Sequence, residues 1–522
     1  MKYIFSDMES IRKYGVDEFL NNDSWPVSDT DFKELYVRIF NEYIKIIKNF
    51  NGPFYDICLV ELSFIAKTIQ ILQANFVKNY CLSNNIVLKR SNLNSGLVMA
   101  SQEWDVIGNF YKDATTTSGK YHRKIRRVVK YFVHNKHIGL FGIISKILTK
   151  DKTLSIGSYD RIKREFVEKG KIICDHCDWS DLLKDKNGNK FTSNNDYVGL
   201  VINPFLHKVR ELDSLFIDGI DFNLLKKSWY SRFVDIENIY SRVRVDKRSK
   251  GLLVTGVGNQ LHKIIALSYQ RSGVKVFCFH HGNNTGSLIE EISHQILDSY
   301  CVNFVLPSDG MIDIYKKNYS HLLLEKISLT KYLSSKTMYY QSVYNNCKNN
   351  KEMMNGKVVM LMGFPMKPHR YFDEPANDLV FKLSLELRLV KFLKNKGFYV
   401  IYKGHPERKN EVEWIFNTEA DECIFSKFED VWQRTNTVLF TYPSTTTFGY
   451  ALNIDRKIIL IDMNNNNWNT ESLSLLQNRV DMVPAWLDST NRIKFNKNKL
   501  LSSLNREINA IDTEFINKYM WS

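Results

Sequence analysis

The chain has 522 residues, 44% hydrophobic and 13% aromatic, a composition that excludes a disordered or fibrous protein. Its 72 Lys and Arg residues exceed its 57 Asp and Glu residues by 15, and this excess implies an anionic partner: nucleic acid, acidic lipid or a phosphorylated substrate. The length exceeds what one ordinary hydrophobic core fills, so two domains with extensions are expected.

The first 250 residues mix strand-like and helix-like patterns without a clean period. We expect a strand at 55–60, a helix at 62–80, a short strand at 86–89 and a polar loop at 185–195. No window approaches the ~18–20 apolar residues of a membrane span, and the N-terminus lacks the apolar core of a signal peptide. The sequence therefore predicts a soluble or peripheral protein.

The densest basic segment is 120–133, whose apolar residues fall near one helical face and whose Lys and Arg residues fall on the other. This pattern is typical of a helix that lies on an anionic membrane, and it is equally typical of a packed helix with a solvated basic face. Both interpretations stay open at this point. Nucleic-acid binding is not expected, because no recognised nucleic-acid motif accompanies the charge.

The eight Cys residues are scattered without the spacing of a disulfide framework, so a reducing cytoplasm is the simplest explanation. Cys174 and Cys177 form a pair that suggests zinc. A structural zinc site needs a second pair of ligands at suitable spacing, and none follows nearby. An ordinary loop with two free thiols is favoured, and no metal site is predicted.

From residue 251 strands and helices alternate. A strand at 251–255, a helix at 260–270 and a strand at 274–279 form a βαβ unit, for which a parallel sheet is expected. Two histidines follow the second strand, among glycines that allow close backbone approach. We expect this turn to face whatever binds above the sheet. Its residues are His280, His281, Gly282, Asn283 and Asn284.

A polar stretch at 345–351 predicts an interdomain linker, after which the sheet pattern starts again. An amphipathic helix is expected at 378–396, with Gly397 where a C-cap residue belongs. The segment from Leu500 to Phe515 repeats apolar residues at helical spacing, which predicts a C-terminal helix. Further buried strands are expected at 300–306, 357–362, 398–402, 437–442 and 457–461.

Polar side chains follow two of these strands. The strand at 398–402 runs into a Lys-Gly-His-Pro-Glu turn at 403–407, and the strand at 437–442 runs into a hydroxyl-rich helix start at 444–447. Ligands bind beyond the carboxyl ends of parallel strands, and a helix N-terminus attracts phosphate. Each residue alone fits an ordinary turn equally well. Their joint placement at two strand ends favours a nucleotide-phosphate pocket.

These motifs resemble the donor half of bacterial surface-polysaccharide glycosyltransferases with the GT-B fold, over roughly residues 251–465. The pattern is similar to that of capsule Kdo transferases and polysialyltransferases, whose His-Pro motif and downstream Ser/Thr hold the CMP part of the donor. CDP-glycerol-type polyol phosphotransferases share a similar turn. The resemblance implies an α/β, GT-B-like architecture of two Rossmann-like doubly wound domains facing a cleft. The domains expected are 1–344 for the acceptor, 345–495 for the donor, and a helix at 496–522 that returns to the first domain.

The implied function is transfer of a nonulosonic or Kdo-type sugar from a CMP-activated donor to a surface polysaccharide or lipid-linked glycan. The resemblance implies that no metal or cofactor is needed besides the nucleotide sugar. Together with the scattered cysteines and the basic segment 120–133, it leads us to expect a cytoplasmic protein, peripheral on the inner face of the cytoplasmic membrane and bound there through 120–133. A CDP-polyol phosphotransferase or UDP-sugar glycosyltransferase of the same fold is the alternative. A non-catalytic basic protein that binds membrane or nucleic acid is the alternative from another class.

The residues at 403–407 and 444–446 carry over from the matching motifs. Lys367 and Arg370 are assigned from their place after the strand at 357–362, where they could reach the donor's carboxylate or phosphate and fit a solvated basic loop equally well. The acceptor-activating base is harder to assign, because the paired-acid-plus-Gly motif of polysialyltransferases is reduced here to Asp218-Gly219 with a single acid. His281 has the best context, at a strand end with an imidazole that can accept a proton near neutral pH, and Asp105, Glu103 and Asp309 are further candidates. A histidine that orients the donor or holds an oxyanion fits the position of His281 equally well. The turn at 280–284 is assigned to the cleft and the acceptor. The expected donor-binding residues are Gly363, Lys367, Arg370, Lys403, His405, Pro406, Glu407, Ser444, Thr445 and Thr446.

Overall fold

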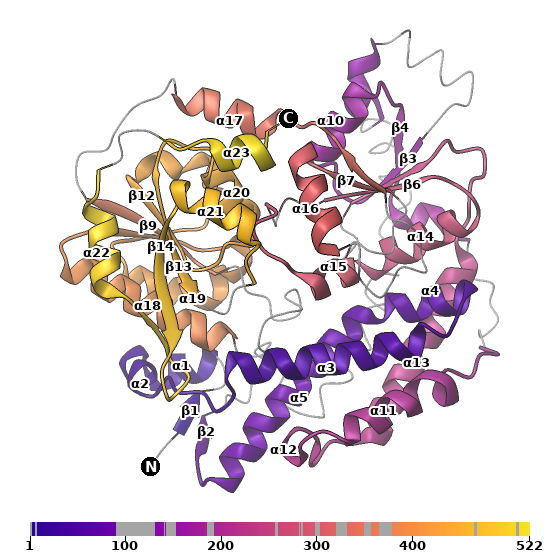
Figure 1. Ribbon diagram of the computed structural model, residues 1–522. Helices are drawn as coiled ribbons and strands as arrows, with labels where there is room; N and C mark the ends of the chain where they lie inside the picture. Colours follow the sequence, from indigo (N-terminus) through magenta and orange to yellow (C-terminus); the bar gives the residue numbers. More distant parts are fainter. Residues whose placement is uncertain are drawn as a thin grey trace.

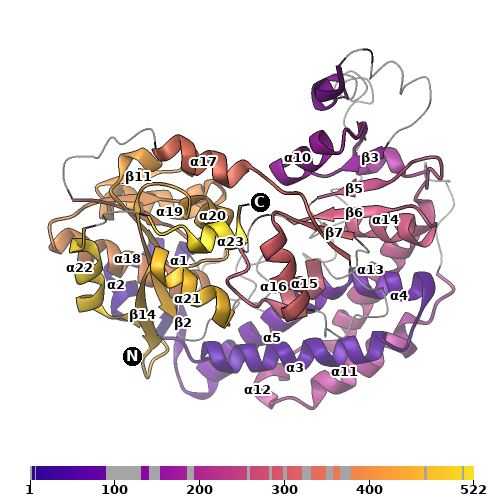
Figure 2. The same cartoon turned by 45° about the horizontal axis from the view of Figure 1, so that its top comes forward.

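The chain folds into two α/β units that lie side by side, with a layer of helices along one edge of the pair (Figures 1 and 2). The helical layer contacts the first unit most closely and is drawn in indigo to magenta in Figure 1. The computed structural model describes residues 3–5, 8–89, 131–139, 141, 153–184, 193–255, 259–280, 282, 285–297, 303–319, 331–348, 357–364, 378–463, 467–507 and 511–521.

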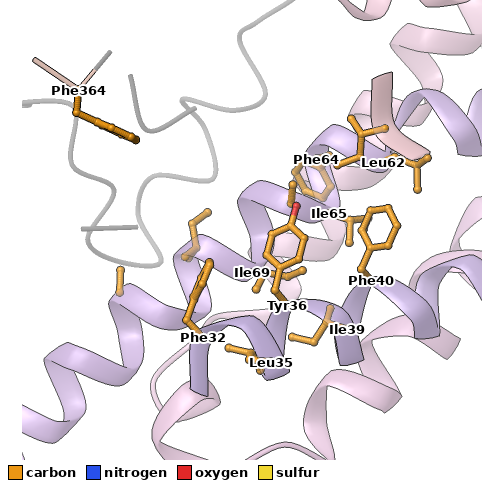
Figure 3. Close-up of a cluster of buried hydrophobic side chains, with 14 of the residues drawn as sticks. Phe32, Leu35, Tyr36, Ile39, Phe40, Leu62, Phe64, Ile65, Ile69 and Phe364 are labelled. Atoms are coloured by element: carbon orange, nitrogen blue, oxygen red, sulfur yellow. The ribbon is translucent and has the colours of Figure 1, made fainter. Parts of the chain in front are cut away.

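The helical layer is built on α3 and α5, whose apolar faces pack against each other (Figure 3). Ser28 caps α3, because its hydroxyl accepts a hydrogen bond from the backbone N–H of Asp31 at 3.0 Å. A buried ion pair joins the layer, since Arg232 donates to Glu61 at 2.8 Å while both side chains are almost fully enclosed. The helices of the layer are α3 (Asp29–Ile47), α4 (Gly52–Val60), α5 (Leu62–Ser83), α11 (Asn203–Arg210), α12 (Ser214–Ile217) and α13 (Phe222–Arg242).

Two expectations fail in this layer. The strand expected at 55–60 is helix α4, which has a proline in its first turn and is buried along 55–60. A short apolar run does not distinguish a buried strand from a buried helix. The expectation that no segment could span a membrane was also wrong by length and composition, because the helical stretch Gly52–Ser83 passes that test. Its apolar window is entirely buried inside the protein, as the core helix of a globular domain would be.

The first sheet contains six strands, all parallel, in the order β4-β3-β5-β6-β7-β8. The expected βαβ unit is confirmed as β5, α14 and β6. Helices α10 (Arg161–Lys169), α14 (Gln260–Arg271), α15 (Glu291–Leu297) and α16 (Asp309–Tyr319) lie between the strands in sequence. The strands are β3 (Thr153–Ile156), β4 (Cys174–His176), β5 (Leu252–Val254), β6 (Val276–Phe279), β7 (Asn303–Leu306) and β8 (Lys331–Ser334).

The second sheet has the order β11-β10-β9-β12-β13-β14-β15, with only β15 antiparallel. Its helices are α17 (Tyr339–Lys348), α18 (Asp378–Asn395), α19 (Lys409–Glu419), α20 (Thr446–Ala451) and α21 (Thr470–Arg479). The strands are β9 (Val358–Met362), β10 (Tyr399–Lys403), β11 (Glu422–Ile424), β12 (Thr437–Phe440), β13 (Lys457–Met463), β14 (Asp481–Leu487) and β15 (Ile493–Phe495).

Both strand orders are those of doubly wound folds, in which the chain starts in the middle of the sheet and builds outward in both directions. The expected α/β class and the GT-B-like arrangement of two Rossmann-like units are confirmed by these orders. The units are joined by backbone hydrogen bonds, from Ile289 to the carbonyl of Asn467 and from Asn469 to the carbonyl of Ser287, both at 2.8 Å. The exact domain boundaries at 344 and 495 stay predictions.

The N-terminal segment 8–28 lies against the second unit, next to the start of α3 (Figure 1). Asp23 is enclosed and contacts the guanidinium groups of Arg388, on α18, and Arg492, beside β15. The Trp25 amide donates to the carbonyl of Thr490 at 3.0 Å. The segment comprises α1 (Met8–Tyr14) and α2 (Val16–Asn21), and the nearby strands β1 (Tyr3–Phe5) and β2 (Val87–Lys89) pair in parallel.

The stripe from Leu500 to Phe515 is not one continuous helix. It is divided into α22 (Lys497–Asn505) and α23 (Glu514–Tyr519). The two helices bury their apolar residues in different places: Leu500 against the second sheet, and Phe515 between α16 and α21. Helix α23 therefore contacts both units. The expected linker at 345–351 also begins as helix, because Val343 and Cys347 lie one turn apart on α17 and pack into the second unit.

The cysteines differ from expectation in two respects. Cys174 lies on strand β4 rather than in a loop, and burial raises the pKa of its thiol to about 12. Cys278 on β6 is disulfide-bonded, whereas six other described cysteines are free thiols. The described ranges contain no group of three His, Cys, Asp or Glu side chains placed to hold a metal ion.

Candidate functional site

The candidate site lies where the second sheet reverses its order, between β9 and β12. These strands are parallel neighbours, with Leu361 opposite Leu439, so the residues that follow each strand emerge at the same edge. Gly363 follows β9, and Ser444 follows β12. The carboxyl ends of strands at such a reversal form the ligand-binding crevice of open α/β sheets. The structure thus brings the expected residues of two separate motifs to one edge.

The Lys-Gly-His-Pro-Glu turn lies at the same edge, because β10 pairs with β9. Lys403 is 5% exposed, and its ammonium donates to the carbonyl of Gly404 at 2.7 Å. Burial lowers the pKa of Lys403 to about 8, while the nearby Glu429 carboxylate acts in the opposite direction. His405 is partly exposed at the start of the short 3₁₀ turn Pro406–Arg408. Pro406 is exposed beside it, and the side chain of Glu407 lies outside the described residues.

Two glycines at these strand ends serve close packing. A Cβ built on Gly363 would lie 2.3 Å from the hydroxyl of Tyr402, and one built on Gly404 would lie 2.3 Å from the ring of Phe425. Either contact is far shorter than two non-bonded atoms tolerate. Gly363, expected to bind the donor, is therefore required first of all by the buried tyrosine on the neighbouring strand.

A buried polar network ties the ends of β9 and β10 together. Arg408 Nη1 donates to the carbonyl of Phe364 at 2.6 Å and lies 3.3 Å from the Glu386 carboxylate. Glu386, on α18, also accepts from the hydroxyl of Tyr402 at 2.9 Å and from the backbone N–H of Phe364. All three charged or polar side chains are inaccessible to solvent. The network fixes the position of the two loops that carry the expected donor-binding residues.

Cations predominate among the buried ionisable groups at these strand ends. The ammonium of Lys382, on α18, lies 5.0 Å from the ring centre of Phe364 and 5.7 Å from that of Tyr442. Glu386 pairs with Arg408 there, and the less buried carboxylates of Glu429 and Glu411 act on Lys403 and Arg408. Sequence reasoning missed Lys382 and Arg408. Arg408 directly follows the recognised turn, but nothing in the sequence shows that it turns inward.

The hydroxyl-rich helix start is only partly available to a ligand. The Thr445 hydroxyl caps the six-residue helix α20, because it accepts from the backbone N–H of Phe448 at 3.0 Å. Ser444 is buried, Thr445 is partly exposed and Thr446 is exposed. The expected group of three hydroxyls is thus divided into a structural cap at Thr445, a buried side chain at Ser444 and an exposed one at Thr446.

The first unit meets this edge through the turn after β6. His280 is buried, and its Nδ1 accepts from the backbone N–H of Gly282 at 3.0 Å, which holds the turn in place. Gly282 has a φ of +85°, which glycine adopts without strain. A Cβ built on Gly282 would lie 3.6 Å from the Cγ2 of Thr446. The expected cleft residue Gly282 and the expected donor residue Thr446 are therefore neighbours across the two units.

The first sheet has its own order reversal, between β3 and β5, but its polar groups there are used internally. Lys163 is enclosed, and its ammonium donates to the carbonyl of Ile156 at 2.8 Å and to the hydroxyl of Thr255 at 3.3 Å. A Cβ on Gly157 would lie 2.1 Å from the carbonyl oxygen of Thr255. The second sheet is the better candidate for ligand binding.

Several expected site residues fall outside the described residues, and their roles stay predictions. The proposed base and its two further candidates are among them, as are two cleft residues and two donor-binding residues. They are His281, Asp105, Glu103, Asn283, Asn284, Lys367 and Arg370.

No protein-family model matches the chain, and no curated protein matches it. Among solved structures it is similar to UDP-GlcNAc 2-epimerase from Methanocaldococcus jannaschii, in complex with UDP-GlcNAc and UDP. The identity is 14% and the TM-score 0.37, over 68% of this chain and 93% of that one. It is also similar to the wall teichoic acid polymerase TagF soaked with CDPG, at 9% identity and a TM-score of 0.28, over 66% of this chain and 79% of that one. At these identities and TM-scores the two matches carry no information about substrate or reaction.

Proposed function

We propose that the protein is a glycosyltransferase that binds the phosphate of a nucleotide-activated sugar at the carboxyl ends of β9, β10 and β12. The observation that carries this proposal is the placement of three buried cations, Lys382, Lys403 and Arg408, at these strand ends. Glu386 pairs with Arg408, and the less buried Glu411 and Glu429 also act on this group. Cations gathered at such an edge attract an anionic ligand. A nonulosonic or Kdo-type sugar linked to CMP is the donor proposed, on the resemblance of the His-Pro turn and the Ser/Thr turn.

The chemistry follows from the charges at the site. In transfer from a CMP donor, the bond between the anomeric carbon and the phosphate oxygen breaks, and CMP leaves with the bonding electrons. The acceptor hydroxyl oxygen forms the new bond to the anomeric carbon and gives its proton to a base. Lys403 and a donated hydrogen bond from His405 stabilise the charge that develops on the phosphate. His281 is proposed as the base, with Asp105 and Glu103 as further candidates. No metal is proposed, because the cations take over that role.

A second candidate function uses the same crevice. In a CDP-polyol phosphotransferase the acceptor oxygen attacks phosphorus instead of carbon, and CMP leaves as before. A UDP-sugar glycosyltransferase differs from a CMP-sugar transferase in its donor, which carries uracil instead of cytosine and leaves as UDP. The buried cations suit the phosphates of all three donors equally, so the choice among them rests on the motif resemblance.

The acceptor proposed is a surface polysaccharide or a lipid-linked glycan, held near the inner face of the cytoplasmic membrane by segment 120–133. Support comes from the described end of that segment, where Phe132 is 44% exposed and Val133 is 57% exposed. A packed amphipathic helix would bury these two side chains. Their exposure beside a run of Lys and Arg favours the membrane-surface interpretation.

The decisive experiment is a thermal-shift series with CMP, CDP, UDP and GDP. Selective stabilisation by CMP supports a CMP-sugar transferase, and selective stabilisation by CDP or UDP supports the second candidate function. Stabilisation by none of the four nucleotides contradicts the proposal and leaves a non-catalytic basic protein. A Lys403→Met variant serves as the control, because loss of the buried ammonium should reduce the shift for whichever nucleotide binds.

A further inference from the structure

Tyr340 has its hydroxyl at the junction of the two units. It lies in the first turn of α17, the helix that enters the second unit, and its side chain is 7% exposed. A Cβ built on Gly282, in the turn after β6, would lie 3.7 Å from this hydroxyl. A Cβ built on Gly449, in α20, would lie 3.4 Å from it. The hydroxyl therefore lies between the two segments that carry the expected acceptor and donor residues.

The Tyr340 hydroxyl makes no hydrogen bond to another residue in the described ranges. The hydroxyl oxygen is not among the buried polar atoms that lack a partner, so it reaches solvent although most of the ring is enclosed. Phenylalanine would fill the same space without presenting a donor there. The hydroxyl is thus a hydrogen-bond donor that a ligand at the junction of the two units can reach.

The two adjoining glycines leave that hydroxyl uncovered on both sides. Gly282 is needed for the positive φ of its turn. Gly449 has no such need, and glycine within a helix costs about 1 kcal/mol relative to alanine. Its lack of a side chain relieves a contact, since a methyl group there would lie 3.1 Å from the Cγ2 of Thr285 as well as against the Tyr340 hydroxyl.

Charges near Tyr340 favour an anion as its partner. The guanidinium of Arg161 lies 3.6 Å from the ring centre of the adjacent Tyr339. Burial raises the pKa of Tyr340 to about 12, with Arg161 acting against the rise and Glu429 adding to it. The phenol therefore keeps its proton at neutral pH and can donate it. Lys403 adds a second positive charge near Glu429.

We infer that Tyr340 donates a hydrogen bond to a phosphate oxygen of the nucleotide donor, from the helix that links the two units. This inference rests on the proposed function and extends it. Donor binding would then use a residue outside the Lys-Gly-His-Pro-Glu and Ser/Thr turns, and the donor would contact both sides of the junction.

The test uses the full-length protein and three variants, titrated calorimetrically with CMP, CDP and UDP. Tyr340→Phe removes only the hydroxyl and should weaken binding of the preferred nucleotide by about tenfold, the effect of a hydrogen bond to a charged group. Its thermal midpoint should stay nearly the same, because the hydroxyl makes no hydrogen bond to another described residue. Tyr344→Phe is the matched control on the same helix, with its ring against Trp521 at 4.9 Å, and should bind like wild type.

Gly449→Ala provides an independent second variant. Its methyl group would cover the Tyr340 hydroxyl, so nucleotide affinity should fall, and combination with Tyr340→Phe should produce little further loss. Wild-type affinity in Tyr340→Phe overturns the inference and leaves the proposed function intact. A lower thermal midpoint with unchanged affinity also overturns it and assigns the tyrosine a packing role. If the wild-type protein binds none of the three nucleotides, the proposed function and this inference both fail.

Discussion

Arg408 donates from its Nη1 to the carbonyl oxygen of Phe364 at 2.6 Å, which joins the turn after β10 to the loop after β9. The Arg408 side chain is neutralised by Glu386, and both side chains are fully enclosed. Its Nε and Nη2 have no hydrogen-bond partner. The arginine is therefore a positioning residue. It holds together the two loops at the point where the sheet reverses its strand order, and it keeps His405 in place at the start of the turn Pro406–Arg408.

This relationship predicts a large loss of stability in Glu386→Gln. The substitution leaves the fully enclosed Arg408 guanidinium without the carboxylate it pairs with, and loss of one partner of a buried ion pair typically costs roughly 3–5 kcal/mol. Urea unfolding followed by tryptophan fluorescence should show the decrease. Glu413→Gln is the matched control, because Glu413 pairs with Lys409 at 3.6 Å on an exposed helix face, and removal of such a pair costs at most about 1 kcal/mol. Equal stability of the two variants would contradict the structural role of the network.

His405→Ala should lose most transfer activity while keeping its fold. The imidazole follows the end of β10 and is partly exposed, so its removal deletes a donor to the phosphate without disturbing the core. Loss of one charge-stabilising donor lowers turnover by about 10²–10³-fold. His207→Ala, on the exposed face of α11, should keep wild-type turnover. A folded His405→Ala protein with unchanged turnover would exclude the phosphate role of this histidine.

Substitution of Ser444 should affect nucleotide binding, whereas substitution of Thr445 should affect stability. Thr445→Ala removes the cap of α20 and should cost about 1 kcal/mol of stability, whereas Thr445→Ser should retain the cap. Ser444→Ala should leave stability nearly unchanged and weaken nucleotide binding. Calorimetry on the double alanine variant checks the site itself. CMP affinity equal to that of wild type would place the phosphate elsewhere.

Nucleotide affinity should fall as the pH rises through about 8, because burial lowers the pKa of Lys403 to that value and the ammonium loses its charge there. A bound phosphate favours the charged form, so binding between pH 8 and 9 should take up a proton. Calorimetry in two buffers of different ionisation enthalpy measures that uptake. Lys403→Arg keeps its charge throughout and should show neither effect. Persistence of the pH dependence in Lys403→Arg would assign it to another group.

The lowered pKa of Lys403 has the opposite effect on the stability of the folded protein. The unfolded chain binds a proton at Lys403 up to its ordinary pKa near 10.5, whereas the folded protein releases it near 8. The unfolded state therefore holds more protons between these two values, so the contribution of Lys403 to stability rises with pH across that window. Binding weakens where this contribution to folding grows, which distinguishes loss of the ligand contact from alkaline unfolding.

Segment 120–133 should bind vesicles that contain anionic lipid, and binding should fall steeply with salt, because each Lys or Arg contributes about 1 kcal/mol through a screened attraction. Reversal of Arg123, Arg126 and Arg127 to Glu should abolish it and spare transfer to a short soluble acceptor. Val133→Ser should weaken it, since that side chain is 57% exposed. Val37→Ser, at an exposed position on α3, is the matched control. Co-sedimentation of the triple variant with vesicles would contradict the membrane assignment.

Sequence patterns located the strands that contain a run of four or more apolar residues. Strand β9 and the strands β10 and β13 appear as apolar runs because helices cover both faces of a parallel sheet. Strands β3 and β4 were missed, since each has only three or four residues and includes polar ones such as Ser155 and His176. Short mixed segments carry no period that distinguishes a strand from a loop.

The site was predicted only in part for a different reason. The two motifs at 403–407 and 444–447 could be read locally, because each combines a strand end with polar residues. That β9 lies between their strands depends on strand order, which no local pattern encodes. Lys382, Arg408 and Tyr340 enter the site through helices whose inward faces are set by packing. Sequence spacing places such residues on a helix face without showing what that face contacts.

The placement of segment 8–28 against the second unit has a consequence for synthesis of the chain. Asp23 contacts Arg492, and the amide of Trp25 bonds to Thr490, so these early residues have their partners near the other end of the sequence. At ribosomal rates of ~5–20 residues per second, roughly 20–100 s separate the appearance of the two. During that interval Trp25, buried in the finished protein, lacks its final neighbours Phe381 and Thr490. The first helices to leave the ribosome are thus among the last to reach their native position.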